Sequence, residues 1–208
     1  MQIINIKGGN NVYSSNVYMV LGEWKKMNDL STLIDVGSDP SIIDVINSMN
    51  MGVGKKKVDQ VILTHNHSDH MSILPLIIKE YNPRVYAFSP FLEGVTDILA
   101  DGQTLLIGDQ YFEVCHTPGH SSDSISLYNA NNKVLFVGDT SVVIRGIGNG
   151  VYEEDYINAL KKLCQKQVRA IYFGHGDPVF GNGQSLLVES LRNIRNGMRK
   201  EAQTVQQN

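Results

Sequence analysis

The first half of the chain consists of short apolar or alternating runs separated by polar turn residues. Runs of this length, bounded by such residues, are typical of buried strands. They predict strands at Gln2–Ile6, Val17–Leu21, Thr32–Val36, Gln60–Thr64 and Val85–Phe88. Longer stretches with apolar residues at helical spacing predict helices at Ser41–Met49 and Asp69–Lys79, the second ending before Pro83.

The second half repeats this pattern of many short strands with interposed helices. The predicted strands are Thr104–Ile107, Tyr111–His116, Ser124–Tyr128, Val134–Val137 and Ala170–Phe173. The predicted helices are Glu153–Gln165 and Gln184–Arg199. Strands in both halves with helices between them favour an α/β fold of two packed sheets flanked by helices. We expect one domain over residues 1–208, with residues 203–208 as a disordered polar tail.

Composition and charge limit the classes of protein to which this chain can belong. Hydrophobic residues make up 42% of the chain, enough for a substantial core, and 18 basic against 21 acidic residues argue against a nucleic-acid partner. We find neither an apolar run long enough to span a membrane nor a signal peptide at the N-terminus. Only two cysteines, Cys115 and Cys164, are present, so we expect no disulfide framework and a cytoplasmic location.

The most informative segment is Thr64–His70, which follows the apolar run Val61–Leu63. It holds three imidazoles and a carboxylate within six residues, namely His65, His67, Asp69 and His70. Alternate side chains of an extended segment share a face, so the first two histidines can point to one place. The turn into the following helix can redirect the other two toward a neighbouring point. This geometry predicts two adjacent sets of metal ligands, the alternative being a histidine-rich surface loop.

Three further strand ends each carry one possible ligand. His120 follows a Pro-Gly turn, Asp139 follows the strand at Val134–Val137, and His175 follows the strand at Ala170–Phe173. Each is weak evidence alone, because a single polar residue after a strand is more often part of a loop. Together they form a series with a glycine beside each donor, which lets the backbone approach a metal closely.

These ordered motifs, together with Leu33–Gly37, resemble those of the metallo-β-lactamase superfamily over nearly the whole chain. The resemblance implies a four-layer αββα sandwich with a metal site at one edge of the two sheets. It assigns one metal to His65, His67 and His120. It assigns a second metal to Asp69, His70 and His175, with Asp139 bridging both. Asp35 would then lie behind the ligands and hold either a ligand imidazole or the backbone of the site, whereas His116 is expected to make no metal contact.

Imidazole and carboxylate donors suit Zn²⁺, with iron or manganese also possible, and seven ligands exceed what one tetrahedral metal uses. Two divalent ions would share a bridging water and lower its pKa, and the resulting hydroxide would attack the substrate. Asp69 could orient that hydroxide as a catalytic residue. We therefore predict a metal-dependent hydrolase acting on a small molecule with an ester, thioester, lactone or similar bond.

The choice of substrate stays open. Gly138–Gly148 is similar to the corresponding stretch of glyoxalase II and persulfide dioxygenases, but Asn149 follows where those relatives carry arginine, which argues against a glutathione conjugate. The alternatives are an iron-dependent oxidoreductase of persulfide dioxygenase type, with His65, His120 and Asp139 as ligands, and a non-catalytic metal-binding protein. Loops at 10–16, 88–101 and 145–154 are expected to form the substrate pocket, with Tyr13, Phe91, Arg145 and Tyr152 as possible contacts.

Overall fold

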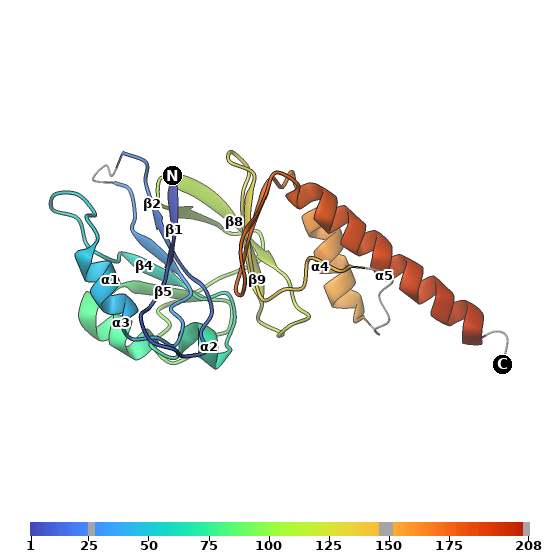
Figure 1. The fold of residues 1–208 in the computed structure, drawn as a ribbon, viewed down its shortest axis with the longest axis horizontal. Coiled ribbons are helices and arrows are strands. Elements are labelled where there is room, and N and C mark those ends of the chain that lie inside the picture. The colour runs from blue at the N-terminus through green and yellow to red at the C-terminus, as the bar shows by residue number, and fades with distance from the viewer. Residues whose placement is uncertain (25–27, 146–151, 206–208) are drawn as a thin grey trace.

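The computed structural model describes residues 1–24, 28–145 and 152–205, and its strands form two six-stranded sheets (Figure 1). The first sheet runs in chain order: β1 (Gln2–Ile6), β2 (Val17–Leu21), β3 (Thr32–Ile34), β4 (Gln60–Ile62), β5 (Arg84–Ala87) and β6 (Asp97–Ile98). The second sheet is ordered β12 (Val179–Phe180), β11 (Ala170–Phe173), β10 (Val134–Gly138), β9 (Ile125–Asn129), β8 (Gln110–His116) and β7 (Thr104–Ile107).

Helices cover the outer face of each sheet. On the first sheet lie α1 (Ile42–Ser48), α2 (Ser68–Met71) and α3 (Leu74–Tyr81), and on the second lie α4 (Glu154–Cys164) and α5 (Gly183–Val205). The last part of α5 extends beyond the sheets (Figure 1). The order of layers is helix, sheet, sheet, helix, which confirms the predicted αββα sandwich.

Alternating side chains in the central strands explain why the sheets stack in this way. In β2, Met19 packs into the core under α1 and α3, whereas its neighbours Tyr18 and Val20 face the second sheet. In β10, Phe136 points into the core between the sheets, while Leu135 packs under α4 and α5. Since successive side chains of a strand point to opposite faces, strands that are apolar at every position bury both faces.

Two pairs of parallel strands place the candidate site at one edge of the sandwich. β3 pairs in parallel with β4 in the first sheet, and β10 pairs in parallel with β11 in the second. Parallel neighbours end at the same edge, so the segments that follow these four strands come together. They carry Asp35, His65, Asp139 and His175 respectively.

The structure departs from the predicted elements where the pattern was too short or was interrupted. The single helix predicted over Asp69–Lys79 is divided into α2 and α3, because Pro75 lacks an N–H and fits only in the first turn of a helix. The two-residue strands β6 and β12 are too short to show an alternation. Helix α5 continues to Val205, so the expectation of a disordered tail from residue 203 is wrong for residues 203–205, and residues 206–208 lie outside the described part.

Candidate metal centre

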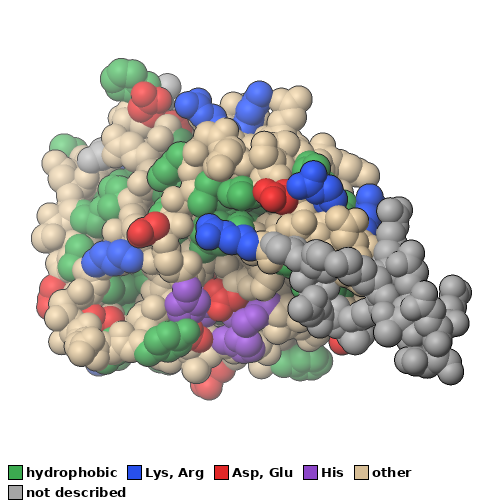
Figure 2. Space-filling view, turned by 45° about the vertical axis from the view of Figure 1, so that its right-hand side comes forward, with side chains coloured by type: hydrophobic (Ala, Val, Ile, Leu, Met, Phe, Trp, Pro, Cys, Tyr) green, Lys and Arg blue, Asp and Glu red, His purple; other side chains and the backbone are tan. Residues whose placement is uncertain are grey.

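All seven predicted ligands lie together at this edge of the sandwich, where histidine and acidic side chains gather on one face (Figure 2). Ligand atoms within 4.8 Å of one another define three overlapping groups. They are His65, His67 and His120; His65, His70 and Asp139; and Asp69, His70 and His175. Because His65 and His70 each belong to two groups, the three groups form one continuous cluster.

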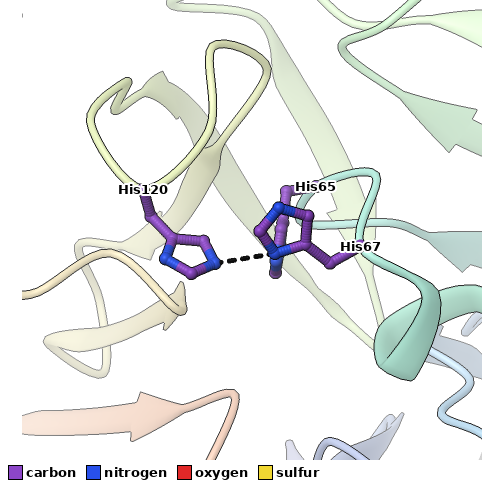
Figure 3. Close-up of side chains that lie close together, drawn as sticks. All are labelled: His65, His67 and His120. Carbon is purple, nitrogen blue, oxygen red and sulfur yellow. Dashed lines mark hydrogen bonds between the residues drawn. The ribbon is translucent and has the colours of Figure 1, made fainter.

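The first group is made of three histidines from two segments. His65 and His67 come from the segment after β4, and His120 comes from the loop between β8 and β9 (Figure 3). His120 Nε2 lies 2.9 Å from His67 Nδ1. The His65 ring lies 4.6 Å from that of His67 and 4.9 Å from that of His120, centre to centre. Three ring nitrogens at this spacing suit a tetrahedral Zn²⁺ that takes a fourth ligand from solvent or substrate.

The second group combines two histidines with a carboxylate. His175 Nε2 lies 2.9 Å from Asp69 Oδ2, and His70 Nε2 lies 3.8 Å from the same oxygen. Asp139 stands between the two groups. Its Oδ1 lies 3.3 Å from His70 Nε2, and its Oδ2 lies 3.6 Å from His120 Nε2 and 3.5 Å from His175 Nε2. One carboxylate therefore reaches histidines of both groups.

Buried polar atoms without partners show that these residues fit a metal. His65 Nε2, His70 Nε2 and Asp139 Oδ1 are buried and have no hydrogen-bond partner. Burying such an atom unpaired is costly, and apart from the 3.3 Å approach of His70 Nε2 to Asp139 Oδ1 the protein offers these atoms no partner. The three atoms belong to the middle group of the cluster, where a cation would satisfy all of them at once.

Asp35 fixes which nitrogen of two of these histidines faces the cluster. An ionised carboxylate only accepts hydrogen bonds, so the 2.8 Å contact with Asp35 Oδ2 requires His70 Nδ1 to donate. Thr64 donates its hydroxyl proton to the same oxygen at 2.8 Å, and its Oγ1 lies 3.0 Å from His65 Nδ1. Since that proton is already engaged, His65 Nδ1 must donate to Thr64. Both histidines therefore turn Nε2 toward the cluster, and that is the atom a metal would take, in place of a proton in the case of His70.

The backbone stores some strain in this support. Asp35 has φ of +57°, in the left-handed region that non-glycine residues seldom adopt, at a cost of roughly 1–3 kcal/mol. The conformation is held by a hydrogen bond from the Thr64 amide to Asp35 Oδ1 and by one from the Asp35 amide to Ile62 O. The expected role of Asp35, holding a ligand imidazole, agrees with these contacts.

The electrostatic balance of the cluster favours a cation. Burial lowers the pKa of His70, but Asp35 and Asp139 outweigh it and raise that pKa to about 10. Burial, together with the neighbouring His70, lowers the pKa of His65 to about 4. One imidazole is thus held protonated by carboxylates while its neighbour is held neutral. A metal ion in place of the His70 proton would meet the same carboxylates and a neutral imidazole.

The amino-terminal segment ties the two halves of the cluster together. The Asn16 amide donates to Gly174 O at 2.6 Å, and the Asn16 side chain donates to Phe173 O and Gly176 O, which flank His175. The Ser15 amide donates to Asp69 O at 3.0 Å. Residues 15 and 16 thus fix the backbone that carries a ligand from each sheet, a function that the sequence pattern did not indicate.

His116 supports the cluster without belonging to it. Its ring stacks on Phe88 at 4.0 Å between centres, and its Nε2 donates to Ser122 O at 2.8 Å. That carbonyl lies in the loop that carries His120. His116 belongs to none of the three ligand groups, and its Nε2 is engaged with the backbone.

The predicted substrate-contacting residues have different surroundings. Tyr13 is 78% exposed and stacks on the His175 ring at 5.2 Å, so it forms part of the mouth of the site. Tyr152 lines a cavity of about 390 Å³ beside His120. Phe91 is 92% exposed and Arg145 is also exposed. The predicted loop at 145–154 lies outside the described residues from 146 to 151.

The hydrogen bonds of Thr64 lead to a direct test of the support for His65. We expect Thr64→Val to weaken metal binding at the three-histidine group roughly 10-fold to 100-fold, as loss of a partner behind a metal ligand commonly does. Thr64→Ser keeps the hydroxyl and is expected to bind metal nearly as the wild type does. Zinc titration against a competing chelator measures both, and equal affinities for the two variants would show that the hydroxyl has no such role.

The comparisons with known proteins give the family. The model of the metallo-beta-lactamase superfamily matches residues 10–175, which include all seven clustered residues. The chain belongs to the metallo-beta-lactamase superfamily. Within the described residues, no helix is long and apolar enough to cross a membrane.

Individual relatives share only part of their length with this chain. A beta-lactamase-like protein 2 homolog of Drosophila melanogaster is 32% identical over 165 residues, 71% of this chain and 55% of that protein. A hydroxyacylglutathione hydrolase of Legionella pneumophila is 35% identical over 83 residues, 38% of this chain and 32% of that protein. The chain thus spans between about a third and just over half of the length of these relatives.

Among solved structures, the fold is similar to that of the chemotaxis sensor ODP, whose structure holds a peroxy diiron species. The TM-score is 0.69 at 14% identity, over 92% of this chain and 90% of that one. At this identity the similarity shows the fold alone.

Proposed function

We propose that this protein is a metal-dependent hydrolase that cleaves an ester, thioester, lactone or similar bond of a small molecule. The observation that carries the proposal is the convergence of seven side chains on one edge, with three buried ligand atoms left unpaired. The hydroxyacylglutathione hydrolase relative supports hydrolysis as the type of reaction.

In this proposal His65, His67 and His120 hold one divalent ion, and Asp69, His70 and His175 hold a second, with Asp139 shared between them. Zinc is the proposed metal because it is commonly bound by imidazole nitrogens and carboxylate oxygens such as these. When bound, two such ions supply Lewis acidity and lower the pKa of water toward neutrality.

In this proposal, residues of the protein itself orient the ligands and the attacking water and line the substrate cavity. Asp35 and Thr64 hold the two buried imidazoles with Nε2 toward the cluster. Asp69 is proposed to orient the attacking water, because its Oδ2 lies beside His175 at the half-exposed side of the cluster. A cavity of about 340 Å³, lined by His120, Asp139 and His175 among others, adjoins the cluster. Its size is within the range usual for small-molecule sites.

A small-molecule substrate, rather than nucleic acid, agrees with the net charge of −3. A cytoplasmic location is also part of the proposal, since Cys115 and Cys164 are free thiols.

Iron chemistry is the second candidate, because ODP, which shares the fold, holds a diiron species. An oxidoreductase of persulfide dioxygenase type would use His65, His120 and Asp139 as the iron ligands. Oxygen uptake with a persulfide substrate tests it separately from hydrolysis.

The proposed hydrolase is tested by a screen of metal-loaded protein on chromogenic esters, thioesters, lactones and phosphodiesters. We expect hydrolysis of at least one carboxylic ester, thioester or lactone. His67→Ala is expected to lower metal content and rate together, by more than about 100-fold in rate, because it removes a ligand rather than a supporting residue. His116→Ala serves as the control histidine and should keep its metal. Hydrolysis at the wild-type rate by His67→Ala would refute the proposed role of this residue.

A further inference from the structure

A third cavity, larger than the two described above, lies near the segment that carries His67 and has no part in the function described so far. Its volume is about 720 Å³, and it lies between helices α2 and α3 and the segment at residues 92–94. Most of its walls are apolar side chains, namely Met71, Leu74, Pro75, Ile78 and Leu92. We refer to it as the α3 groove. Small-molecule sites are commonly clefts of about 300–1,000 Å³ with predominantly hydrophobic linings.

One end of the α3 groove reaches the chain segment that carries His67. Asn66 and Ser68 line it, and these two residues flank His67 in the chain. His67 is exposed, whereas His65 and His70 are buried, so His67 forms the rim of the cluster on this side. A ligand bound at the cluster can therefore extend past His67 into the groove.

The shape of the groove is set by a close approach of its two walls. At Gly94, which has φ of +85°, an added Cβ would lie 2.6 Å from Ile78 Cδ1. The segment is also closed by a turn in which the Val95 amide donates to Leu92 O at 3.3 Å. Glycine permits both the backbone conformation and the contact with α3. The wall at 92–94 is therefore seated on the helix, which keeps the groove in place when it is empty.

The charge of the lining identifies the kind of group that fits. Of the residues that line the groove, only Glu93 is ionisable, and none is basic. An anionic group would find no cation there and would meet a carboxylate. A neutral aliphatic chain, in contrast, would remove apolar surface of both partners from water.

We propose that the α3 groove binds the aliphatic chain of the substrate's acyl group, so that the enzyme prefers acyl chains of medium length over acetyl. This inference rests on the proposed hydrolase function and names the substrate class for that same centre. The carbonyl carbon would lie at the metal cluster, and the chain would run past His67 between α3 and Leu92.

The test uses alkyl hydroxamates, which bind metal through their head group and carry chains of chosen length. We expect octanohydroxamate to bind the zinc-loaded protein about 100-fold more tightly than acetohydroxamate in calorimetric titrations. A fully buried methylene is worth about a fourfold gain in affinity, and the groove is partly open to solvent, so six added methylenes give less than their maximum. Binding is measured without turnover, so it does not depend on which bond the enzyme cleaves.

Two exposed positions of the helical layer supply matched variants. Ser72 is exposed and lines the groove, so Ser72→Phe places a ring inside it. Glu80 is exposed on α3 outside the lining, so Glu80→Phe adds the same ring elsewhere. We expect Ser72→Phe to reduce the preference for octanohydroxamate over acetohydroxamate at least 10-fold. Its affinity for acetohydroxamate should stay within about twofold of that of the wild type. Glu80→Phe should behave as the wild type.

The possible outcomes test the α3 groove proposal and the proposed hydrolase function separately. Equal affinity of the wild type for both hydroxamates, or an unchanged preference in Ser72→Phe, would overturn the α3 groove proposal while leaving the hydrolase intact. A preference lost only in Ser72→Phe, without hydrolysis of any acyl ester, would support the groove and reject the proposed reaction. A protein that binds neither metal nor hydroxamate would reject both.

Discussion

Asp139→Asn is expected to remove most of the metal from both halves of the centre and to lower hydrolysis more than about 100-fold. The carboxylate oxygens of Asp139 lie within 3.3–3.6 Å of the Nε2 atoms of His70, His120 and His175. Asparagine keeps the shape but loses the negative charge, and one end becomes a donor that would point at a cation. Loss of a ligand should exceed the 10-fold to 100-fold effect common for residues behind the ligands. Elemental analysis and kcat/KM measure the two effects.

Asp59→Asn is a matched control for this variant. Asp59 is a partly buried carboxylate directly before β4, at the opposite end of that strand from His65, and it accepts a hydrogen bond from the Ser31 amide at 2.7 Å. We expect a small loss of stability and an unchanged metal content. If Asp139→Asn kept both metals and its activity, the bridging role proposed for this carboxylate would be wrong.

Gly174→Ala is expected to have an effect of similar size, although it removes no ligand. A Cβ at this position would lie 2.1 Å from Asp139 Oδ1 and 2.6 Å from His70 Cε1. Real side chains do not approach so closely, so both ligands or the backbone between them must move. A displacement of this order is enough to disturb a metal centre, whose ligands have to stay within a few tenths of an ångström. We expect a loss of metal and a fall in kcat/KM of more than about 100-fold.

Gly176→Ala, on the other side of His175, separates steric intrusion from backbone strain. An added Cβ there meets nothing within 4 Å, but φ is +79°, so the variant carries only a conformational cost of about 1–2 kcal/mol. Thermal unfolding should show lower stability for Gly176→Ala, with the metal retained. Equal metal loss in both variants would show that backbone strain, and not intrusion into the centre, explains the effect.

Much of the fold and the centre could be predicted because both depend on local patterns. His65 and Asp139 follow strands that are buried on both faces, and such strands are recognisable by composition alone. Gly119, Gly138 and Gly174 each directly precede a predicted ligand, and the structure shows why: a Cβ at Gly138 would meet Thr64, and a Cβ at Gly174 would meet Asp139. The spacing of residues 65–70 therefore predicted that these side chains gather with others in one cluster, as they do in the structure.

The features that the sequence did not reveal depend on long-range contacts. The hydrogen bonds from Asp35 through Thr64 to His65 join two parallel strands, and those of Asn16 reach across to the second sheet. The α3 groove arises where residues 92–94 fold back onto a helix that precedes them, and its lining alternates between polar and apolar positions without a motif. The pattern of residues along the chain carries no information about such long-range contacts, because tertiary packing determines them.

Metal stoichiometry tests the central claim most directly. Protein should be stripped with a chelator, dialysed to equilibrium against zinc, and analysed for zinc per chain, with Asp139→Asn treated in parallel. Two zinc ions per wild-type chain, and a marked loss in Asp139→Asn, are the predicted result. One or no zinc ion per wild-type chain, with the protein folded, would contradict the two-metal centre from which the proposed hydrolysis follows.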